Sequence, residues 1–484
     1  MEQTSVSPQS PLKLNMKRTF IIGFAFFGIL LMWQVYDNYC SSFLSELFIK
    51  AFGIAWETQA QHEAAAEQVQ WLVGIMMAID NVAALIMMPI FGRLSDKTKS
   101  PLGKRMPYIL IGTFICAVAF PFIPLAFHFN MLGALIPLMA ITVFSAMMYR
   151  NPAVALMPDL TPKPLRSKAN GIINIMGYIG GAIPSVLGIF LSLSSYLGTI
   201  DPDKAKAGQL GNIWVIEIPF LLASVFMIAS VVVLFFKIKE NKISEEIADE
   251  MARGEALAEV EDSVADDEDK PMSKANKIML WSILAAEFFW FMADNGVSTF
   301  MSNYTIYHLK ADTSSLMINT IIGGLASVVG FAIAGLIAAK IGRKWSIFSG
   351  LGLTAAAYAA WLIISLAAPT TGIFPVYIFV IFFVKGFGMS LVHVNSLPMV
   401  VELCSSKKVG VFTGYYYAAS MAAQTITPCA LGLLLMLPNF GFDLLPLYAL
   451  SCIALSALIF FFVKNIRKAN QKFTVGIEAI GEND

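Results

Sequence analysis

Long apolar blocks recur along almost the whole chain and are separated by short charged or turn-rich breaks. A helix needs about 20 apolar residues to cross a hydrocarbon core about 30 Å thick. The blocks that meet this length lie at residues 19–45, 69–92, 106–128, 131–157, 171–194, 213–236, 278–301, 317–340, 345–367, 373–400, 409–436 and 441–463. We therefore predict an all-α integral membrane protein with twelve transmembrane helices.

Composition excludes several classes of function. Charged residues make up 14% of the 484 residues, against about 25% in a typical soluble domain, so an ordinary soluble enzyme is excluded. The formal net charge is zero, which leaves no basic surface to hold nucleic acid. Neither a Gly-Lys-Ser/Thr phosphate loop nor a spacing typical of zinc, haem or a Ser-His-Asp triad is present. We expect no enzyme, no cofactor and no metal.

The distribution of Lys and Arg predicts the orientation. With the N-terminus inside, 27 of the 33 Lys and Arg fall in inner segments and four in outer loops. The remaining two, Arg150 and Lys385, fall inside predicted spans. Because cytoplasmic loops hold an excess of positive residues, we predict that both termini are cytoplasmic and that the protein spans the plasma (inner) membrane many times.

The composition becomes acidic and polar in the middle of the chain, which predicts a solvated cytoplasmic linker between two halves. The expected domains are an N-terminal tail, a six-helix half, the linker, a second six-helix half and a C-terminal tail. Their bounds are 1–18, 19–236, 237–277, 278–463 and 464–484.

Short internal matches support two related halves, as in many transporter folds. Asp37-Asn38 in the first span reappears as Asp294-Asn295 in the seventh, at an offset of 257 residues. An offset of 243 residues pairs Asp159 with Glu402 and Arg150 with His393. The stretch 103–105, Gly-Lys-Arg, corresponds to 342–344, Gly-Arg-Lys, at an offset of 239.

The loop after the second span has a recognisable pattern. From Gly92 it reads GRLSDKTKSPLGKRMPY, which places Asp96 four residues on and Gly103, Lys104 and Arg105 before the third span. It resembles the major facilitator superfamily loop, in the lengthened form of the sucrose and proton symporter-like proteins. Because Gly permits close helix approach and Asp accepts hydrogen bonds at a helix end, these residues are predicted to form a loop that latches helices in one conformational state. Plain topology, with basic residues inside, is the alternative.

A second block, RNPAVALMPDLTPKPLRSKANG, starts at Arg150 and contains Asp159 and Arg166. It resembles the branch that includes plant sucrose carriers and their animal and bacterial relatives. The resemblance implies a major facilitator fold of two six-helix halves around a central site. It also implies proton-coupled uptake of a sugar, with a disaccharide or other glucoside as the expected class, and assigns Asp159 and Arg166 to the same gating region as the loop.

Asp37 lies within WQVYDNYCSSF, beyond the midpoint of the first span, among Trp33, Gln34 and Asn38. Aromatic faces stack on sugar rings, while amides and carboxylates bind hydroxyls. We therefore predict that Trp33, Gln34 and Asn38 bind substrate. An interfacial aromatic belt is the alternative.

Asp80 lies near the centre of the second span, with Asn81 as its polar neighbour. A charge at the bilayer centre costs about 2.5 to 3.5 kcal/mol on insertion scales, and burial favours the neutral, protonated carboxyl. Asp80 and Asp37 are therefore the predicted proton-coupling residues. A structural hydrogen bond between helices is the alternative for Asp80.

Further polar residues inside spans are candidates for substrate binding. The Arg150 guanidinium cannot lose its proton in a protein, so inside a span its charge needs a carboxylate, a substrate oxygen or water as a partner. The alternative is that its side chain snorkels to the membrane interface. In the second half, the candidates are Trp290, Asp294, Asn295 and His393. Trp290, Asp294 and Asn295 share a polar face of the seventh span with Glu287. For His393 the alternative is a hydrogen-bonded packing residue.

Together these features predict a sugar and proton symporter that works by alternating access and functions as a monomer in the lipid bilayer. Coupling to sodium instead of protons remains open. A proton-driven exporter of sugars or amphipathic compounds would share the same fold, and a predominantly apolar cavity would favour it. A non-transporting membrane sensor is the remaining alternative, and it would need the linker to dock a partner.

Overall fold

The computed structural model describes residues 12–198, 210–264, 274–367, 374–403, 408–437 and 440–463, and within these ranges all regular structure is helical. In chain order the elements are α1 (Met16–Ala51), α2 (Gln59–Lys97), α3 (Met106–Ala119), α4 (Phe122–His128), α5 (Leu132–Asp159), η1 (Lys163–Leu165), α6 (Arg166–Phe190), α7 (Leu193–Leu197), α9 (Trp214–Lys237), α10 (Glu240–Glu246), α11 (Ala248–Val264), α12 (Lys274–Asn303), η2 (Tyr304–His308), α13 (Thr313–Ile341), α14 (Arg343–Ala367), α15 (Val376–Val401), α16 (Val409–Leu435), η4 (Gly441–Asp443) and α17 (Leu444–Phe461).

Every predicted span coincides with a helix or, for the third, with the consecutive helices α3 and α4. Eleven segments of the described chain are long and apolar enough to cross a membrane. The span predicted at 278–301 lies in α12, which is 30 residues long. This helix is less apolar because Glu287 and Asp294 lie in its middle, together with several amide and hydroxyl side chains.

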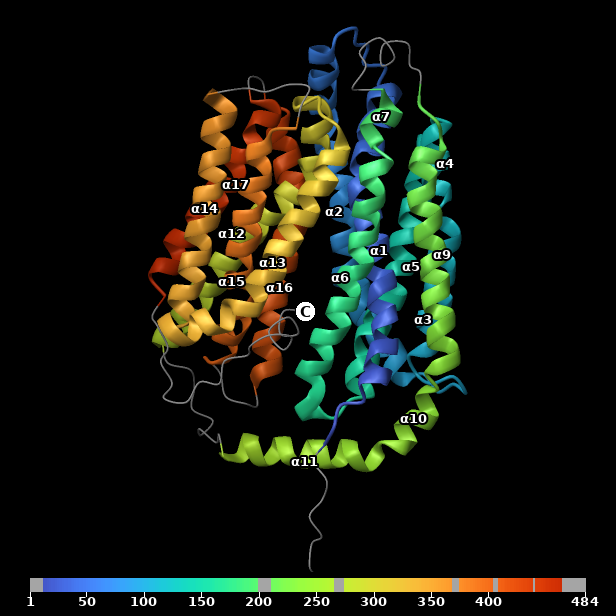
Figure 1. Cartoon of the computed structure of the whole chain (residues 1–484), viewed down its shortest axis with the longest axis vertical. Helices are drawn as coiled ribbons and strands as arrows, with labels where there is room; N and C mark the ends of the chain where they lie inside the picture. The colour runs from blue at the N-terminus through green and yellow to red at the C-terminus, as the bar shows by residue number, and fades with distance from the viewer. Residues whose placement is uncertain are drawn as a thin grey trace, which may run out of the picture.

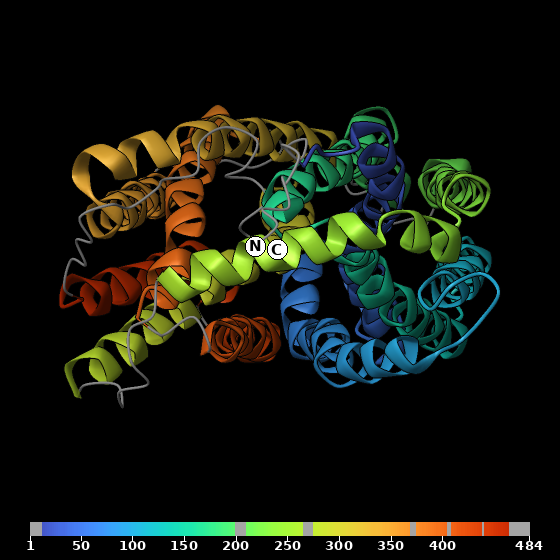
Figure 2. The same ribbon diagram turned by 90° about the horizontal axis from the view of Figure 1, so that it is seen from below.

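The helices form two bundles that lie side by side, α1 to α9 in one and α12 to α17 in the other (Figure 1). Seen from below, α11 runs across the region where the bundles meet (Figure 2). We call the end of the molecule where α10 and α11 lie the linker end, and the opposite end the far end. The linker, predicted to be solvated, is helical from 240 to 264, and the side chain at its first helical position, Glu240, is buried.

Glycines let the two bundles approach closely in their far halves. A Cβ atom on Gly74 of α2 would lie 2.0 Å from the carbonyl oxygen of Pro428 in α16. A Cβ atom on Gly432 of α16 would lie 2.6 Å from the carbonyl oxygen of Gln70. Only a residue without a side chain fits such backbone-to-backbone contact, so these glycines fix the crossing of α2 and α16.

Candidate functional site

Three charged side chains of the first bundle converge from different helices. Asp37 lies on α1, Asp80 on α2 and Arg150 on α5. The negative charge of Asp37 and the positive charge of Arg150 both act on Asp80, so the three groups are electrostatic neighbours. Asp80 is only 9% exposed. The sequence analysis expected Asn81 as the polar neighbour of Asp80, and the structure adds Arg150 as a counter-charge.

The helix that carries Asp37 supplies further polar groups beside it. The Gln34 amide donates to Oδ1 of Asn38 at 3.4 Å, and the Asn38 amide approaches the Met317 sulfur of α13 in the second bundle at 3.5 Å. Trp33 packs edge-on against Tyr36, with ring centroids 5.6 Å apart. The three predicted substrate-binding residues of α1 therefore surround the Asp37 turn, and Asn38 reaches the other bundle.

The second bundle holds a corresponding group of charges. Asp294 of α12 forms an ion pair with Lys385 of α15. His393 lies two turns further along α15, packs against Phe291 with ring centroids 5.4 Å apart, and interacts electrostatically with both Asp294 and Lys385. In the second bundle an acid on the first helix thus pairs with a basic group on the fourth, whereas in the first bundle Arg150 of the fourth helix acts on Asp80 of the second helix.

Two tryptophans extend this correspondence. The offset that pairs Asp37 with Asp294 also pairs Trp33 with Trp290, which gives Trp-x-x-x-Asp-Asn in both halves. Both indole N–H groups are buried, and neither has a hydrogen-bond partner in the part of the chain that the structure describes. Trp290 is fully buried, so it does not face solvent here as a substrate-binding residue would. The sequence analysis used only the shorter Asp-Asn match, although this longer repeat could have paired Trp33 with Trp290 from the sequence alone.

The region between the bundles is accessible from the linker end and closed toward the far end. Asp37 is exposed although it lies in the middle of α1, and Ser298 is exposed on α12, one turn beyond Asp294, the residue that corresponds to Asp37. One turn nearer the far end, Ser41 is 0% exposed and Ser302 is 4% exposed. Because residues four apart share a helix face, the exposure ends between these two turns.

A layer of hydrogen bonds closes this boundary. Ser42 of α1 donates to Oδ1 of Asn303 at 2.8 Å, and the Asn303 amide donates to Oε1 of Gln70 at 2.9 Å and to the Ser45 hydroxyl at 3.0 Å. These residues are fully buried. Because α1 and α2 belong to one bundle and Asn303 to the other, the layer joins the two halves.

An ionic cluster lies beyond this layer at the far end. Glu63 of α2 accepts from His308 at 2.6 Å and from Lys310 at 3.2 Å, both of the second bundle. His308 also lies 3.2 Å from Asp443. Burial lowers the pKa of His308, but the hydrogen bonds to Asp443 and Glu63 outweigh it and raise the pKa to about 9. The sequence analysis missed this cluster because its members lie at span ends and in loops, where charges are common.

A second contact of the same kind involves Glu46, His62 and Tyr307. The Tyr307 hydroxyl donates to Oε1 of Glu46 at 2.9 Å, and Nε2 of His62 lies 3.0 Å from the same oxygen. Trp56 stacks on the His62 ring with centroids 3.9 Å apart. Carboxylates of the first bundle are thus bound by donors of the second at two places at the far end.

At the linker end, the loop from 92 to 105 is held within the first bundle. Arg105 donates from Nε to Oδ2 of Asp159 at 2.8 Å and pairs with Asp96, while Lys104 lies 3.1 Å from the same Asp159 oxygen. A Cβ atom on Gly92 would lie 2.5 Å from the Asn151 amide of α5. In this structure these contacts join the α2–α3 loop to α5 within the first bundle rather than one half to the other.

The second half repeats this contact in simpler form. Arg343 lies 3.3 Å from Glu402, at positions that the sequence offsets pair with Lys104 and Asp159. Gly103 and Gly342 both have positive φ, 110° and 88°, a conformation that favours glycine. Arg166, by contrast, donates to the carbonyl oxygens of Thr161, in the preceding loop, and of Pro158, at the end of α5, both at 3.1 Å.

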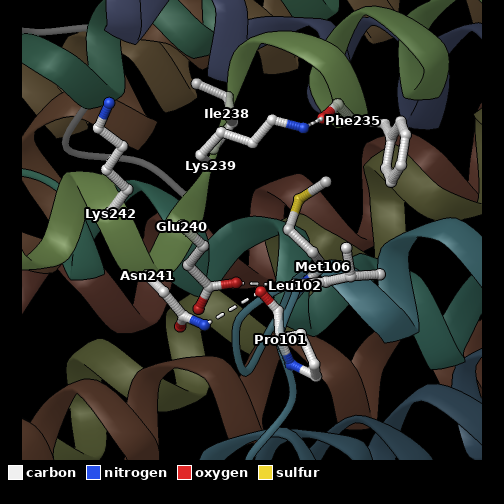
Figure 3. A pocket seen from close by; sticks show the side chains of 9 residues that line it. All are labelled: Pro101, Leu102, Met106, Phe235, Ile238, Lys239, Glu240, Asn241 and Lys242. Carbon is white, nitrogen blue, oxygen red and sulfur yellow. Dashed lines mark hydrogen bonds between the residues drawn. The ribbon is translucent and has the colours of Figure 1, made fainter.

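The linker docks on this loop. The Glu240 carboxylate of α10 accepts from the backbone N–H groups of Lys104, Arg105 and Met106 at 3.0 to 3.2 Å, which caps the start of α3. Asn241 donates to the carbonyl oxygen of Ser100 at 3.0 Å. Figure 3 shows both side chains pointing to the loop, at a small pocket lined by Pro101, Leu102, Met106, Phe235, Ile238, Lys239, Glu240, Asn241 and Lys242.

Metal binding has no support from side-chain geometry. Among the residues that the structure describes, no group of three or more His, Cys, Asp or Glu is placed to hold a metal ion.

Comparison with known sequences identifies a family. The profile described as Major Facilitator Superfamily matches residues 39–379 and 283–480. An uncharacterized symporter of Synechocystis sp. is 31% identical over 163 residues, which cover 32% of this chain and 29% of that protein. The match therefore spans less than a third of the curated relative's length.

Solved structures share the fold. The xylose transporter XylE from E. coli, in a partially occluded inward-open conformation, has a TM-score of 0.61 at 15% identity, over 94% of this chain and all of that one (100%). A bacterial homologue of the iron transporter ferroportin, in an inward-facing state, has a TM-score of 0.61 at 12% identity, over 93% and 99%. These similarities confirm the predicted membrane fold of helices.

Proposed function

The chain belongs to the major facilitator superfamily and is therefore a secondary transporter rather than an enzyme; from that premise we propose that it carries a sugar, a disaccharide or other glucoside, together with a proton. The observation that carries the proposal is that each bundle holds a group of charges inside its spans, Asp37, Asp80 and Arg150 in the first and Asp294 with Lys385 in the second. The symporter name of the Synechocystis relative supports coupled transport.

We assign the linker end to the cytoplasm and the far end to the outside, because Lys and Arg concentrate in segments that this assignment places inside. The structure is then an inward-facing state of a plasma-membrane protein. The moving bodies are residues 19–236 and 278–463, joined by the linker, and they rock about the site between them.

The polar groups between the bundles suit a sugar better than an apolar compound. Gln34, Asn38 and Asn295 offer amides, Asp37 and Asp294 offer carboxylates, and Arg150 offers a guanidinium. Ring hydroxyls need such donors and acceptors, and aromatic side chains cover the C–H faces of the ring. An exporter of amphipathic compounds would instead need mainly apolar walls here.

Asp37 and Asp80 couple the proton to the sugar. While both are ionised, two like charges share a single Arg150, and closure of the halves would remove the water that reaches Asp37, which disfavours closure. Protonation removes this penalty, and sugar contacts from both halves favour the occluded state. The Arg105–Asp159 contact with Asp96 and Lys104 holds the inner ends of the first bundle together during the exchange.

The test is uptake into reconstituted vesicles across a panel of sugars, with and without an inwardly directed pH gradient. We expect gradient-driven accumulation of at least one glucoside in the wild type. In Asp80→Asn or Asp37→Asn, accumulation falls to simple equilibration while exchange of sugar across the membrane is partly retained. The absence of accumulation for every sugar, or its dependence on sodium alone, contradicts the proposal.

A further inference from the structure

Glu287 is a carboxylate buried without a partner in the middle of α12. Its side chain is 0% exposed, and neither Oε1 nor Oε2 has a hydrogen-bond partner in the described part of the chain. The sequence placed it on one polar face with Asp294. The structure separates the two, because Asp294 is partly exposed and pairs with Lys385.

The helices packed against this part of α12 supply no counter-charge. The sequence of α17, Leu444–Phe461, contains no charged residue, and it contacts the neighbouring turn when Ser456 donates to the carbonyl oxygen of Ala286 at 2.8 Å. The α16 segment Val409–Leu435 contains no charged residue either. Its Tyr416 interacts electrostatically with Glu287, but the Tyr416 hydroxyl is bonded to Ser396 at 2.8 Å.

The basic groups of α15 are directed to Asp294. Lys385 forms the ion pair, and the charges that act on His393 are those of Asp294 and Lys385. The first helix of the other bundle reaches α12 at the far end, where Ser42 lies 3.1 Å from Ser302. No cation among these neighbours compensates an ionised Glu287.

An unpaired, buried carboxylate costs several kcal/mol, whereas the neutral acid avoids most of that cost. We propose that Glu287 is a proton-binding site of the second half, that it is protonated in this state, and that it releases its proton to the linker-end side once that side opens far enough for water to reach it. Asp294 is held in its charged form by Lys385 and therefore does not bind and release a proton. This inference deepens the proposed symport and rests on it for the coupling role, but not for the protonation itself.

Infrared difference spectroscopy tests the protonation without any substrate. Wild-type protein in nanodiscs shows the carbonyl stretch of a protonated carboxyl that Glu287→Gln lacks, and that Glu287→Asp shifts rather than abolishes. The matched control Asp294→Asn keeps this band and loses ionised carboxylate bands instead. If Glu287→Gln removes only ionised carboxylate bands, Glu287 is charged and the proposal is overturned, whatever the protein transports.

The coupling role is tested separately by transport. In vesicles, Glu287→Gln reduces gradient-driven accumulation to equilibration and makes sugar exchange independent of pH. Glu287→Asp restores part of the accumulation, which a merely structural role would not predict. Wild-type accumulation in Glu287→Gln overturns the coupling role, while failure of the wild type itself to accumulate any sugar rejects the proposed function and leaves the infrared result intact.

Discussion

At the scale of single residues, the acids inside the molecule differ in whether a cation lies against them. Asp294 and Glu63 lie against cations, Lys385 for the first and Lys310 for the second. Glu287 has no such partner in the region described. Because a nearby cation stabilises the ionised form and burial alone disfavours it, neighbours rather than residue type decide which carboxylates carry protons.

His308 gives the far-end closure a pH dependence. Its pKa is raised to about 9 while Glu63 and Asp443 hold it, against about 6.5 when it is free. Protonated His308 therefore stabilises the closed far end fully at pH values below the pKa of the free imidazole, and this stabilisation is lost as the pH at the far end rises through about 9. Each unit by which the pKa of His308 in the closed state exceeds that of the free imidazole corresponds to at most about a tenfold change in the ratio of closed to open molecules. The change is smaller for a group that is partly exposed.

Pulsed electron paramagnetic resonance between spin labels at Glu57 and Val376 measures this opening. We expect a longer distance to gain population between about pH 7 and about pH 10 in the wild type. In His308→Gln the ratio of closed to open populations varies much less over this range. A wild-type distance that does not respond to pH contradicts the role given to His308.

At the scale of helices, the crossing of α2 and α16 sets the closed far end. Gly74 lies where any side chain would meet the Pro428 carbonyl oxygen at 2.0 Å. Real Cβ atoms do not approach backbone oxygen so closely, so a larger residue forces the helices apart. The polar layer of Ser42, Gln70 and Asn303 depends on this crossing.

Gly74→Ala tests the crossing with the smallest possible change. We expect loss of the inward-facing population in the Glu57–Val376 distance measurement and at least a severalfold fall in transport. The matched control is Gly133→Ala in α5, where nothing lies within 4 Å of an added Cβ, and it leaves both readouts unchanged. Equal behaviour of the two variants rules out the steric role of Gly74.

At the scale of the whole molecule, the sequence predicted what hydrophobicity and repetition encode. Apolar length located every span, and the offsets paired the stretch 342–344 with 103–105 and Glu402 with Asp159. The contacts at these positions, Arg343 with Glu402 and Lys104 with Asp159, came from the structure. The far-end closure depends on contacts between residues more than 200 positions apart, and the surroundings of Glu287 come from helices that follow it by more than 100 residues. No local sequence pattern predicts such contacts. The acidic composition of the linker predicted a solvated segment and therefore gave no indication that Glu240 binds the backbone at the start of α3.

Sugar-induced proton movement tests symport most directly. A transported glucoside is added outside lightly buffered vesicles that contain the protein. No pH gradient is imposed, and the pH of the external medium is recorded. We predict alkalinisation of the medium as protons enter with the sugar, an effect that a protonophore abolishes and Asp80→Asn prevents. Entry of the sugar with no accompanying proton movement contradicts symport.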